Sequence, residues 1–250
     1  MRRTALALAV VILSLEAHDA SALRLGDEVV IVPIIGRFPG AGGTQWRTDV
    51  FLGNAYTPGA SVILKFYQSG GPLHTRTVSL PEYSTTTLPD IVLNTFGLAN
   101  AAGVLEISVP GGRINARARI YNAGNPAGEF GQGVPGIATV YLNRQSYLFG
   151  LSGTGGNRLN IGVTNPTDVA TEVQISVRDR FNGFLHARSV TVPPHGNVQY
   201  NDIFRTFGIA PQDGVVVQFN TANTIIYGYA SEVRNDTGDA VFTFGLSPNS

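Results

Sequence analysis

Short runs in which apolar and polar residues alternate recur along the chain and predict β-strands. In the first half these runs are SVILKFY (61–67), HTRTVSL (74–80), VLEISV (104–109) and RINARARIY (113–121). Turn clusters such as QSGG and PGG separate them. In the second half, TEVQISVRD and FLHARSVTV flank Phe181-Asn182-Gly183, and Asn-Gly favours a tight hairpin. The pattern therefore predicts an all-β fold of antiparallel strands.

One helical segment is expected in each half. PDIVLNTFG (89–97) and NDIFRTFG (201–208) each place an Asp before a short apolar stretch and a Gly after it. Such an Asp can cap a helix start and the Gly can end it. We expect a short connecting helix, packed in the first half by Ile91 and Phe96.

Beyond residue 22, the sequence of the first half of the chain is similar to that of the second half. Pro81 and Pro193 lie 112 residues apart, and around them VSLPEYSTTTLPDIVLNTFG matches VTVPPHGNVQYNDIFRTFG. The same comparison pairs Asn54 with Asn165, Asp90 with Asp202, and Gly103 with Gly214. We predict a tandem duplication with a seam near Gly136. The domains are 23–136 and 137–250, and each has the size of an immunoglobulin-like β-sandwich.

The first 22 residues have the features of a secretory signal peptide. Arg2 and Arg3 precede an apolar stretch over 5–15, and Ala20-Ser21-Ala22 is a small-x-small cleavage pattern. We predict cleavage after Ala22 and a secreted, periplasmic or cell-surface protein without a membrane span; an uncleaved anchor is the alternative. The apolar stretch is too short for a stable transmembrane helix.

Composition excludes several kinds of function. Lys plus Arg number 17 and Asp plus Glu number 17, so the formal charge of zero gives no reason to expect a nucleic-acid partner. The absence of Cys removes disulfides, thiol catalysis and zinc-thiolate sites. G-x-S-x-G, H-E-x-x-H and EF-hand patterns are also absent. GQGVPG (131–136) has dinucleotide-site spacing, but a strand follows it where a helix is required. We predict no catalytic residues and no cofactor.

Metal ligands are weakly represented. His74, His186 and His195 lie in separate turn or hairpin contexts and are expected to be solvated surface imidazoles. In the turn RNDTGDA, Asp236 and Asp239 are weak candidates for calcium, which usually takes six or more oxygens. A hairpin turn is the expected role of this segment.

The run RINARARIY carries the clearest candidate for binding. With a period of two, one face holds Arg113, Asn115, Arg117, Arg119 and Tyr121. This Arg-aromatic ladder can bind carboxylates, sulfates or sugar rings. Alternatively, it is the solvated face of an antiparallel sheet beside Glu or Asp, and this is the expected role.

The stretch WRTDVFLGN (46–54) contains the only Trp. No His or second carboxylate is near Asp49 in sequence to form an acid-base pair. The matched position of the second half is Asn160, so hydrogen bonding serves both copies and ionisation is not required. We expect a structural Asp49. Trp46 is expected to cover one end of the sandwich, and a sugar platform is the alternative.

Several motifs of the first half together resemble a known kind of protein. WRTDVFLGN, LP, DIVLNTFG, ARARIYN and GEFGQGVP, in this order, resemble a family of largely uncharacterised bacterial secreted repeats with an immunoglobulin-like sandwich. The match covers most of 43–135, and the second half departs from it at Asn157, Leu159 and Asn160. The resemblance implies an extracytoplasmic accessory or interaction module without catalytic residues.

These observations leave three classes of function. The expected one is an exported, non-catalytic interaction or structural module of the cell envelope or secreted fraction, with an envelope or secreted protein as partner. The alternative is a carbohydrate-binding module that holds a polysaccharide. An exported hydrolase is the third class, and nothing in the spacing supports it. The ligand residues proposed for the alternative are Trp46, Arg113, Arg117, Arg119 and Tyr121.

Overall fold

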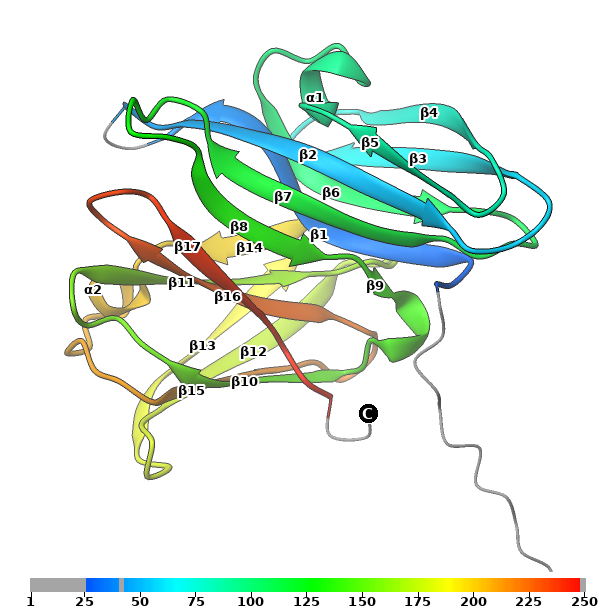
Figure 1. The fold of residues 1–250 in the computed structure, drawn as a ribbon. Helices are drawn as coiled ribbons and strands as arrows, with labels where there is room; N and C mark the ends of the chain where they lie inside the picture. Colours follow the sequence, from blue (N-terminus) through cyan, green and yellow to red (C-terminus); the bar gives the residue numbers. More distant parts are fainter. Residues whose placement is uncertain (1–25, 41–42, 248–250) are drawn as a thin grey trace, which may run out of the picture.

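The computed structural model describes residues 26–40 and 43–247 (Figure 1). The predicted signal peptide lies outside these residues. The elements of the first half are β1 (Val29–Pro39), β2 (Gln45–Asn54), β3 (Ala60–Gln68), β4 (Leu73–Leu80), β5 (Ser84–Leu88), α1 (Ile91–Asn94), β6 (Ala101–Ser108), β7 (Asn115–Asn122) and β8 (Phe130–Pro135). The connection between the halves contains β9 (Ile137–Ala138) and the 3-10 turn η2 (Thr139–Tyr141).

The second half follows with the same succession of elements. They are β10 (Gln145–Leu151), β11 (Asn157–Thr164), β12 (Thr171–Arg178), β13 (Phe184–Val192), β14 (Asn197–Tyr200), α2 (Ile203–Phe207), β15 (Val215–Asn220), β16 (Tyr227–Arg234) and β17 (Ala240–Phe244). Strands dominate, so the all-β prediction is confirmed. No helix in the described part of the chain is long and apolar enough to cross a membrane.

Strand pairing follows one scheme in both halves. The second half has two sheets with the strand orders β10-β15-β12-β13 and β14-β11-β16-β17. In the first half, β4-β3-β6-β1 and β5-β2-β7-β8 follow the same orders, and every pairing is antiparallel. The end of β1 also pairs with β2, Phe38 opposite Trp46, which joins the first half's sheets into one. Alternating apolar residues fill the space between the sheets of each half, including Leu52, Leu64 and Leu105 in the first and Ile161, Ile175 and Val217 in the second.

Matched asparagines make matched hydrogen bonds. Asn54 Nδ2 donates to Pro81 O at 3.1 Å, and Asn165 Nδ2 donates to Pro193 O at 3.2 Å. In each case the Oδ1 atom accepts the backbone N–H two residues further on, at 3.0 Å. Each side chain therefore stabilises a turn of its own half, and the two turns are equivalent, as expected if the two segments share an origin.

The pairing of Gly103 with Gly214 is wrong by one residue. Gly103 lies opposite Ile35, whereas Val215, not Gly214, takes the equivalent place opposite Leu151. The segment from Asp202 to Phe207 is one residue shorter than the segment from Asp90 to Phe96. The segment that follows, up to the matched strand position, is one residue longer in the second half. Sequence matching alone aligned the two glycines because it placed no compensating gap.

The short helices form where they were expected, and Ile91 and Phe96 are buried in the first core. The predicted capping is wrong: neither Asp90 nor Asp202 makes a side-chain hydrogen bond to its helix. Both have left-handed backbones, with φ of 40° and 47°. The Asp90 carboxylate instead forms an ion pair with Arg37.

The connection between the halves lies against the first half. Residues 137–138 pair with β1, and the Gly136 N–H donates to Ala116 O at 3.0 Å. A Cβ at Gly136 would lie 2.6 Å from Val30 Cγ1 and 2.7 Å from Ala116 O. Only glycine therefore fits at this close approach.

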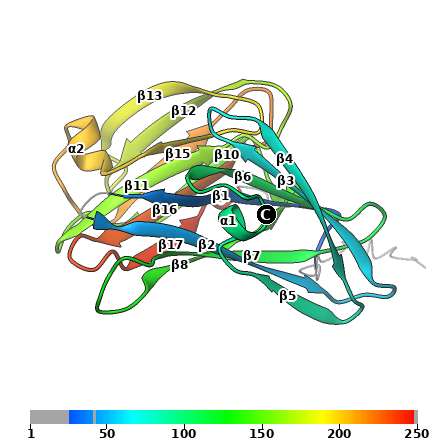
Figure 2. The ribbon, with the colours of Figure 1, turned by 90° about the horizontal axis from the view of Figure 1, so that it is seen from above.

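The two halves contact each other through an apolar patch and hydrogen bonds. Ile31 and Val104 of the first half pack with Tyr227 and Tyr229 of the second. Tyr227 Oη donates to Pro135 O at 3.0 Å. Figures 1 and 2 show β17 beside β8, which places the two halves against each other along these strands.

Candidate functional site

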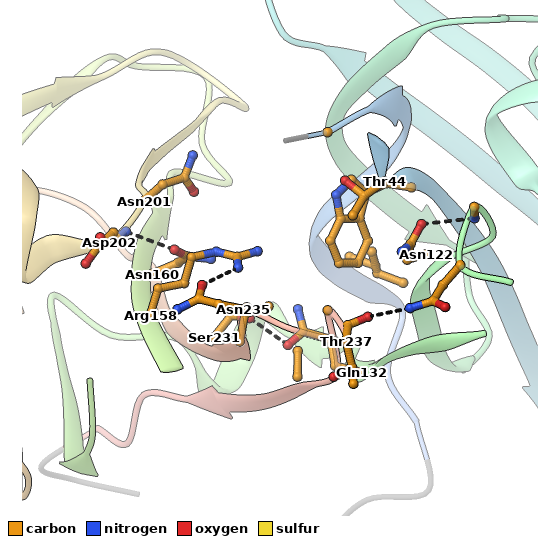
Figure 3. A pocket seen from close by; sticks show the side chains of 18 of the residues that line it. Thr44, Asn122, Gln132, Arg158, Asn160, Asn201, Asp202, Ser231, Asn235 and Thr237 are labelled. Carbon is orange, nitrogen blue, oxygen red and sulfur yellow. Dashed lines mark hydrogen bonds between the residues drawn. The ribbon is translucent and has the colours of Figure 1, made fainter. Parts of the chain in front are cut away.

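A cleft of about 760 Å³ lies between the two halves (Figure 3). This volume is within the range of roughly 300–1,000 Å³ that is usual for ligand sites. Polar side chains from both halves line it, together with a few apolar ones. The first half contributes Ile34, Phe38, Thr44, Trp46, Asn122 and Gln132, and the second contributes Arg158, Asn160, Asn201, Asp202, Ser231 and Asn235.

Trp46 reaches the cleft because of its place in β2. It lies opposite Asn122 of β7, on the sheet face that also carries the buried Thr48 and Val50. The indole packs against the first core and is partly buried, as expected of a residue that covers one end of the sandwich. Since it also lines the cleft, Trp46 offers an apolar surface to a ligand.

Three asparagine side chains have fixed orientations at the cleft. Asn122 Oδ1 accepts two backbone N–H groups, at 2.8 and 3.0 Å, and Asn160 Oδ1 accepts the Asp202 N–H at 3.0 Å. Asn235 Oδ1 accepts from Arg158 Nη1 at 2.8 Å. Because only the amide oxygen can accept these bonds, each NH₂ group must be the free end. Within the described residues, none of these NH₂ groups has a hydrogen-bond acceptor.

Two of these asparagines are almost fully buried. Asn122 is 3% exposed and Asn160 is 7% exposed, although both line the cleft. Neither Nδ2 atom is among the buried side-chain atoms that lack a partner in the described residues, so solvent reaches both NH₂ groups. A ligand that supplies acceptors can therefore bind to them.

The floor of the cleft joins the halves through polar contacts (Figure 3). Ser231 Oγ of β16 donates to Gln132 Oε1 of β8 at 2.8 Å. Asn125 Nδ2 of the first half donates to Thr237 O of the second at 3.2 Å. These bonds fix the two walls relative to each other and so define the width of the site.

Asp49 and Asn160 hold the same backbone position in the two halves. Asp49 Oδ1 accepts the Asp90 N–H at 2.8 Å, as Asn160 Oδ1 accepts that of Asp202. The structure therefore shows the hydrogen-bonding role expected of Asp49. Tyr121 Oη also lies 3.4 Å from Asp49 Oδ1.

The arginines two residues earlier differ between the halves. Arg47 Nε lies 3.5 Å from Asp90 Oδ2, so Arg47 belongs to an ion pair. Arg158, at the matched position, has no carboxylate within 4.0 Å among the described residues. Partial burial lowers the pKa of the Arg158 guanidinium, and the charge of Asp202 opposes this shift.

The carboxylates at the cleft already have cationic partners. Asp202 Oδ2 lies 3.6 Å from Arg205 Nε. Asp236 accepts two hydrogen bonds from Arg234, at 3.0 and 2.8 Å, and the exposed pair lowers the Asp236 pKa to about 2. Bonding to Arg234 leaves little of the Asp236 carboxylate for the weakly predicted calcium site with Asp239. No group of three or more His, Cys, Asp or Glu side chains in the described ranges is placed to hold a metal ion.

The predicted ladder forms, and its arginines are engaged within the sheet. Residues 114, 116, 118 and 120 are buried, which confirms the alternation. Arg117 lies over the Phe51 ring at 4.0 Å, and Arg119 lies over Tyr121 at 4.5 Å and forms an ion pair with Glu129 at 3.0 Å. These contacts match the expected solvated sheet face beside acidic residues.

The tentative ligand residues do not gather into one site. Tyr121 lies opposite Arg47 on β2, and Arg119 lies opposite Asp49, so the ladder occupies the face of the sheet away from Trp46. Arg113 lies 5.7 Å from the Tyr56 ring. Of the five proposed residues, Trp46 alone lines the cleft.

The expectation of solvated histidines is wrong. His74, His186 and His195 are half-buried beside aromatic rings. The His195 ring stacks on Tyr67 of the other half with 4.0 Å between centroids. Sequence separation concealed this stacking because the partners lie in different halves.

Sequence reasoning did not predict the amides and Arg158 of the cleft. Their places along the chain lie between 122 and 235, and they form no motif. The available signal was the departure of the second copy from the Trp-Arg-Thr-Asp pattern at 157–160, which is the strand that supplies Arg158 and Asn160.

The fold and cleft define an all-β, sandwich-like protein with a polar site between its halves. No family model matches the chain, and no curated protein matches it. Among solved structures, a β-glucuronidase of Bacteroides uniformis aligns with a TM-score of 0.16 and 8% identity. The alignment covers 84% of this chain and 25% of that enzyme. The chain thus spans about a quarter of the enzyme's length.

Proposed function

We propose that the chain is an exported, non-catalytic binding module built from two tandem immunoglobulin-like sandwiches, and that it holds a carbohydrate in the cleft. The leader pattern of residues 1–22 supports export, and the repeated strand pairing supports the tandem arrangement. The observation that carries the proposal is the cleft, where Trp46 and oriented amides from both halves converge.

A carbohydrate matches this lining chemically. Its hydroxyl and ring oxygens accept hydrogen bonds from fixed amide donors such as those of Asn122, Asn160 and Asn235. Its C–H faces can pack against the Trp46 indole, which is apolar with one polar edge. A purely apolar ligand would cover these amide groups without giving them acceptors and would bind at a cost.

The electrostatics of the cleft support binding without hydrolysis. Glycoside hydrolysis usually needs two carboxyl groups, one of them a general acid with a raised pKa. The Asp236 pKa is shifted in the opposite direction, to about 2, and Asp202 has Arg205 beside it. Asp236 therefore lacks the raised pKa of a general acid.

Binding can be measured with mature residues 23–250 and isolated envelope polysaccharide. Since Trp46 is the only Trp and lines the cleft, its fluorescence should change on titration. Trp46→Ala, followed by affinity electrophoresis, should lose retention, and so should Asn235→Leu, which alters an exposed turn residue and leaves the cores intact. The control is Tyr83→Ala, because Tyr83 is 72% exposed and does not line the cleft.

Two results would contradict this proposal. The first is that no polysaccharide is retained by the wild-type chain. The second is that both cleft variants, shown to be folded by circular dichroism, bind as the wild type does. N-terminal sequencing of the exported chain tests export separately, with Leu23 expected as the first residue.

A second candidate is binding of a protein partner on the outer face of the β10-β15-β12-β13 sheet. Phe149, Phe184 and Phe181 are 56, 64 and 79% exposed. Arg178 lies between them in the sheet, opposite Phe184, and Arg180 lies 4.9 Å from the Phe181 ring. Exposed aromatic side chains flanked by arginines suit an acidic partner with apolar side chains.

This candidate is tested with Phe149→Ser in cross-linking to the secreted protein fraction. A cross-linked partner that is lost in this variant and kept in Trp46→Ala would favour the sheet face over the cleft. Identical cross-linking by Phe149→Ser and wild type would exclude this face.

A further inference from the structure

We propose that the cleft selects a glycan that bears a carboxylate, a hexuronate unit, and that Arg158 is the group that pairs with this carboxylate. The inference rests on the proposed carbohydrate-binding function and specifies its ligand class. It follows from three properties of the cleft: its hydrogen-bond donors without acceptors, the contacts of Arg158, and the ion pairs of the neighbouring charged residues.

Several hydrogen-bond donors that line the cleft have no acceptor among the described residues. The oxygens of Asn122, Asn160 and Asn235 are occupied by protein donors, which leaves three NH₂ groups for a ligand. Gln132 follows the same pattern, since its Oε1 accepts from Ser231. A hydroxyl group both donates and accepts, whereas a carboxylate only accepts. A ligand with a carboxylate therefore satisfies this lining better than a neutral sugar.

Arg158 is the strongest of these donors. It donates one hydrogen bond, to Asn235, and its partly buried guanidinium has no ion pair among the described residues. Its counterpart Arg47 is paired with Asp90. At matched positions of the two halves, Arg47 therefore forms an internal salt bridge, whereas Arg158 lines the cleft without one. The planar guanidinium matches the two oxygens of a carboxylate.

Arg158 differs from the other charged groups of the cleft in having no ion-pair partner among the described residues. Asp202 pairs with Arg205, and Asp236 pairs with Arg234. The charge of Asp202 acts on Arg158 without a direct contact, so a ligand carboxylate would be the first direct ionic partner of this guanidinium. Phosphate groups are usually held by several cations or by a long helix N-terminus, and α2, beside Asp202, is only five residues long. Arg205, the other lining arginine, is paired with Asp202, so Arg158 alone favours a singly charged group such as a carboxylate.

The test compares hexuronate oligosaccharides with their carboxyl-reduced forms, in which each uronate has become the neutral hexose of the same linkage. A panel of such pairs is titrated into the mature chain and followed by Trp46 fluorescence and calorimetry. We expect at least one uronate oligosaccharide to bind about tenfold or more tightly than its reduced form, as a charge-assisted bidentate contact allows.

Arg158→Gln should abolish this preference and retain the weaker binding of the reduced form. The matched control is Arg117→Gln, which removes the same charge from the ladder, on the other face of the sheet, and should keep the preference. The Arg158 side chain lies at the cleft and outside both cores, so the variant is expected to fold.

The possible failures are distinguishable. Equal affinity for the uronate and reduced forms, or a preference that survives Arg158→Gln, would overturn the assignment of a carboxylate and leave carbohydrate binding standing. Tighter binding of sulfated than of uronate oligosaccharides would also overturn it. Binding of neither form by the wild type would refute the proposed function itself.

Discussion

Replacing Asp49 tests whether this residue supports the fold or performs chemistry. Its Oδ1 atom accepts the backbone N–H of Asp90, whose φ of 40° is left-handed. For a residue other than glycine this conformation costs about 1–2 kcal/mol. In the second half, Asn160 holds Asp202 in the same conformation, φ 47°, without a charge.

The expected changes in the free energy of unfolding follow from the single hydrogen bond between the Asp90 N–H and Asp49 Oδ1. Asp49→Ala leaves the Asp90 N–H without its acceptor, which costs about 1–3 kcal/mol. For a chain of this length, about 2 kcal/mol lowers the melting temperature by roughly 4–8 °C. Asp49→Asn keeps an oxygen at the same place, so its effect should stay within about 0.5 kcal/mol.

Urea unfolding of mature residues 23–250, followed by Trp46 fluorescence, measures this effect, because the indole packs on the first core. Asn160→Ala, followed by circular dichroism, is the matched variant in the second half and should cost a similar amount. Equal destabilisation by Asp49→Asn and Asp49→Ala would show that the charge is needed and would refute the reasoning.

Three further predictions concern other contacts. Asn165→Ala should destabilise the chain by about 2–4 kcal/mol in urea unfolding, and more than Asn54→Ala, because the fully buried Asn165 makes more hydrogen bonds. Gly136→Ala should lower the melting temperature through overpacking, at a cost of about 1–3 kcal/mol or more. Because folding lowers the Asp236 pKa to about 2, the contribution of its pair with Arg234 should be complete above about pH 4 and lost as the pH falls through 2. An NMR titration should show that Arg234→Ala returns this pKa toward 3.8.

The sequence predicted the parts of the fold that depend on local periodicity. The alternation in 113–121 placed Ile114, Ala116 and Ala118 in the core, as the structure shows. The match of Asn54 with Asn165 was informative because both side chains bond within their own half. Interactions that close within one half can recur as the same residue pattern in the other half.

The features that the sequence did not predict depend on contacts between segments that are distant in the chain. Asp90 and Asp202 precede their helices as capping residues do, but their left-handed backbones direct the side chains elsewhere. His195 stacks on Tyr67 across the halves, and the cleft has no sequence motif because its walls come from both halves. No local pattern encodes such contacts.

The two halves share one structural hydrogen bond and differ in the ion pair beside it. Both halves keep the bond from residue 49 or 160 to a left-handed aspartate, because the fold requires it. Only the first keeps the ion pair of the neighbouring arginine: Arg47 bonds to Asp90, whereas Arg158 turns to Asn235 at the cleft. The ion pair is thus present in one half and absent from the other, whereas both halves have the same hydrogen bond to the aspartate backbone. The second half therefore presents a guanidinium at the cleft where the first half has an internal salt bridge.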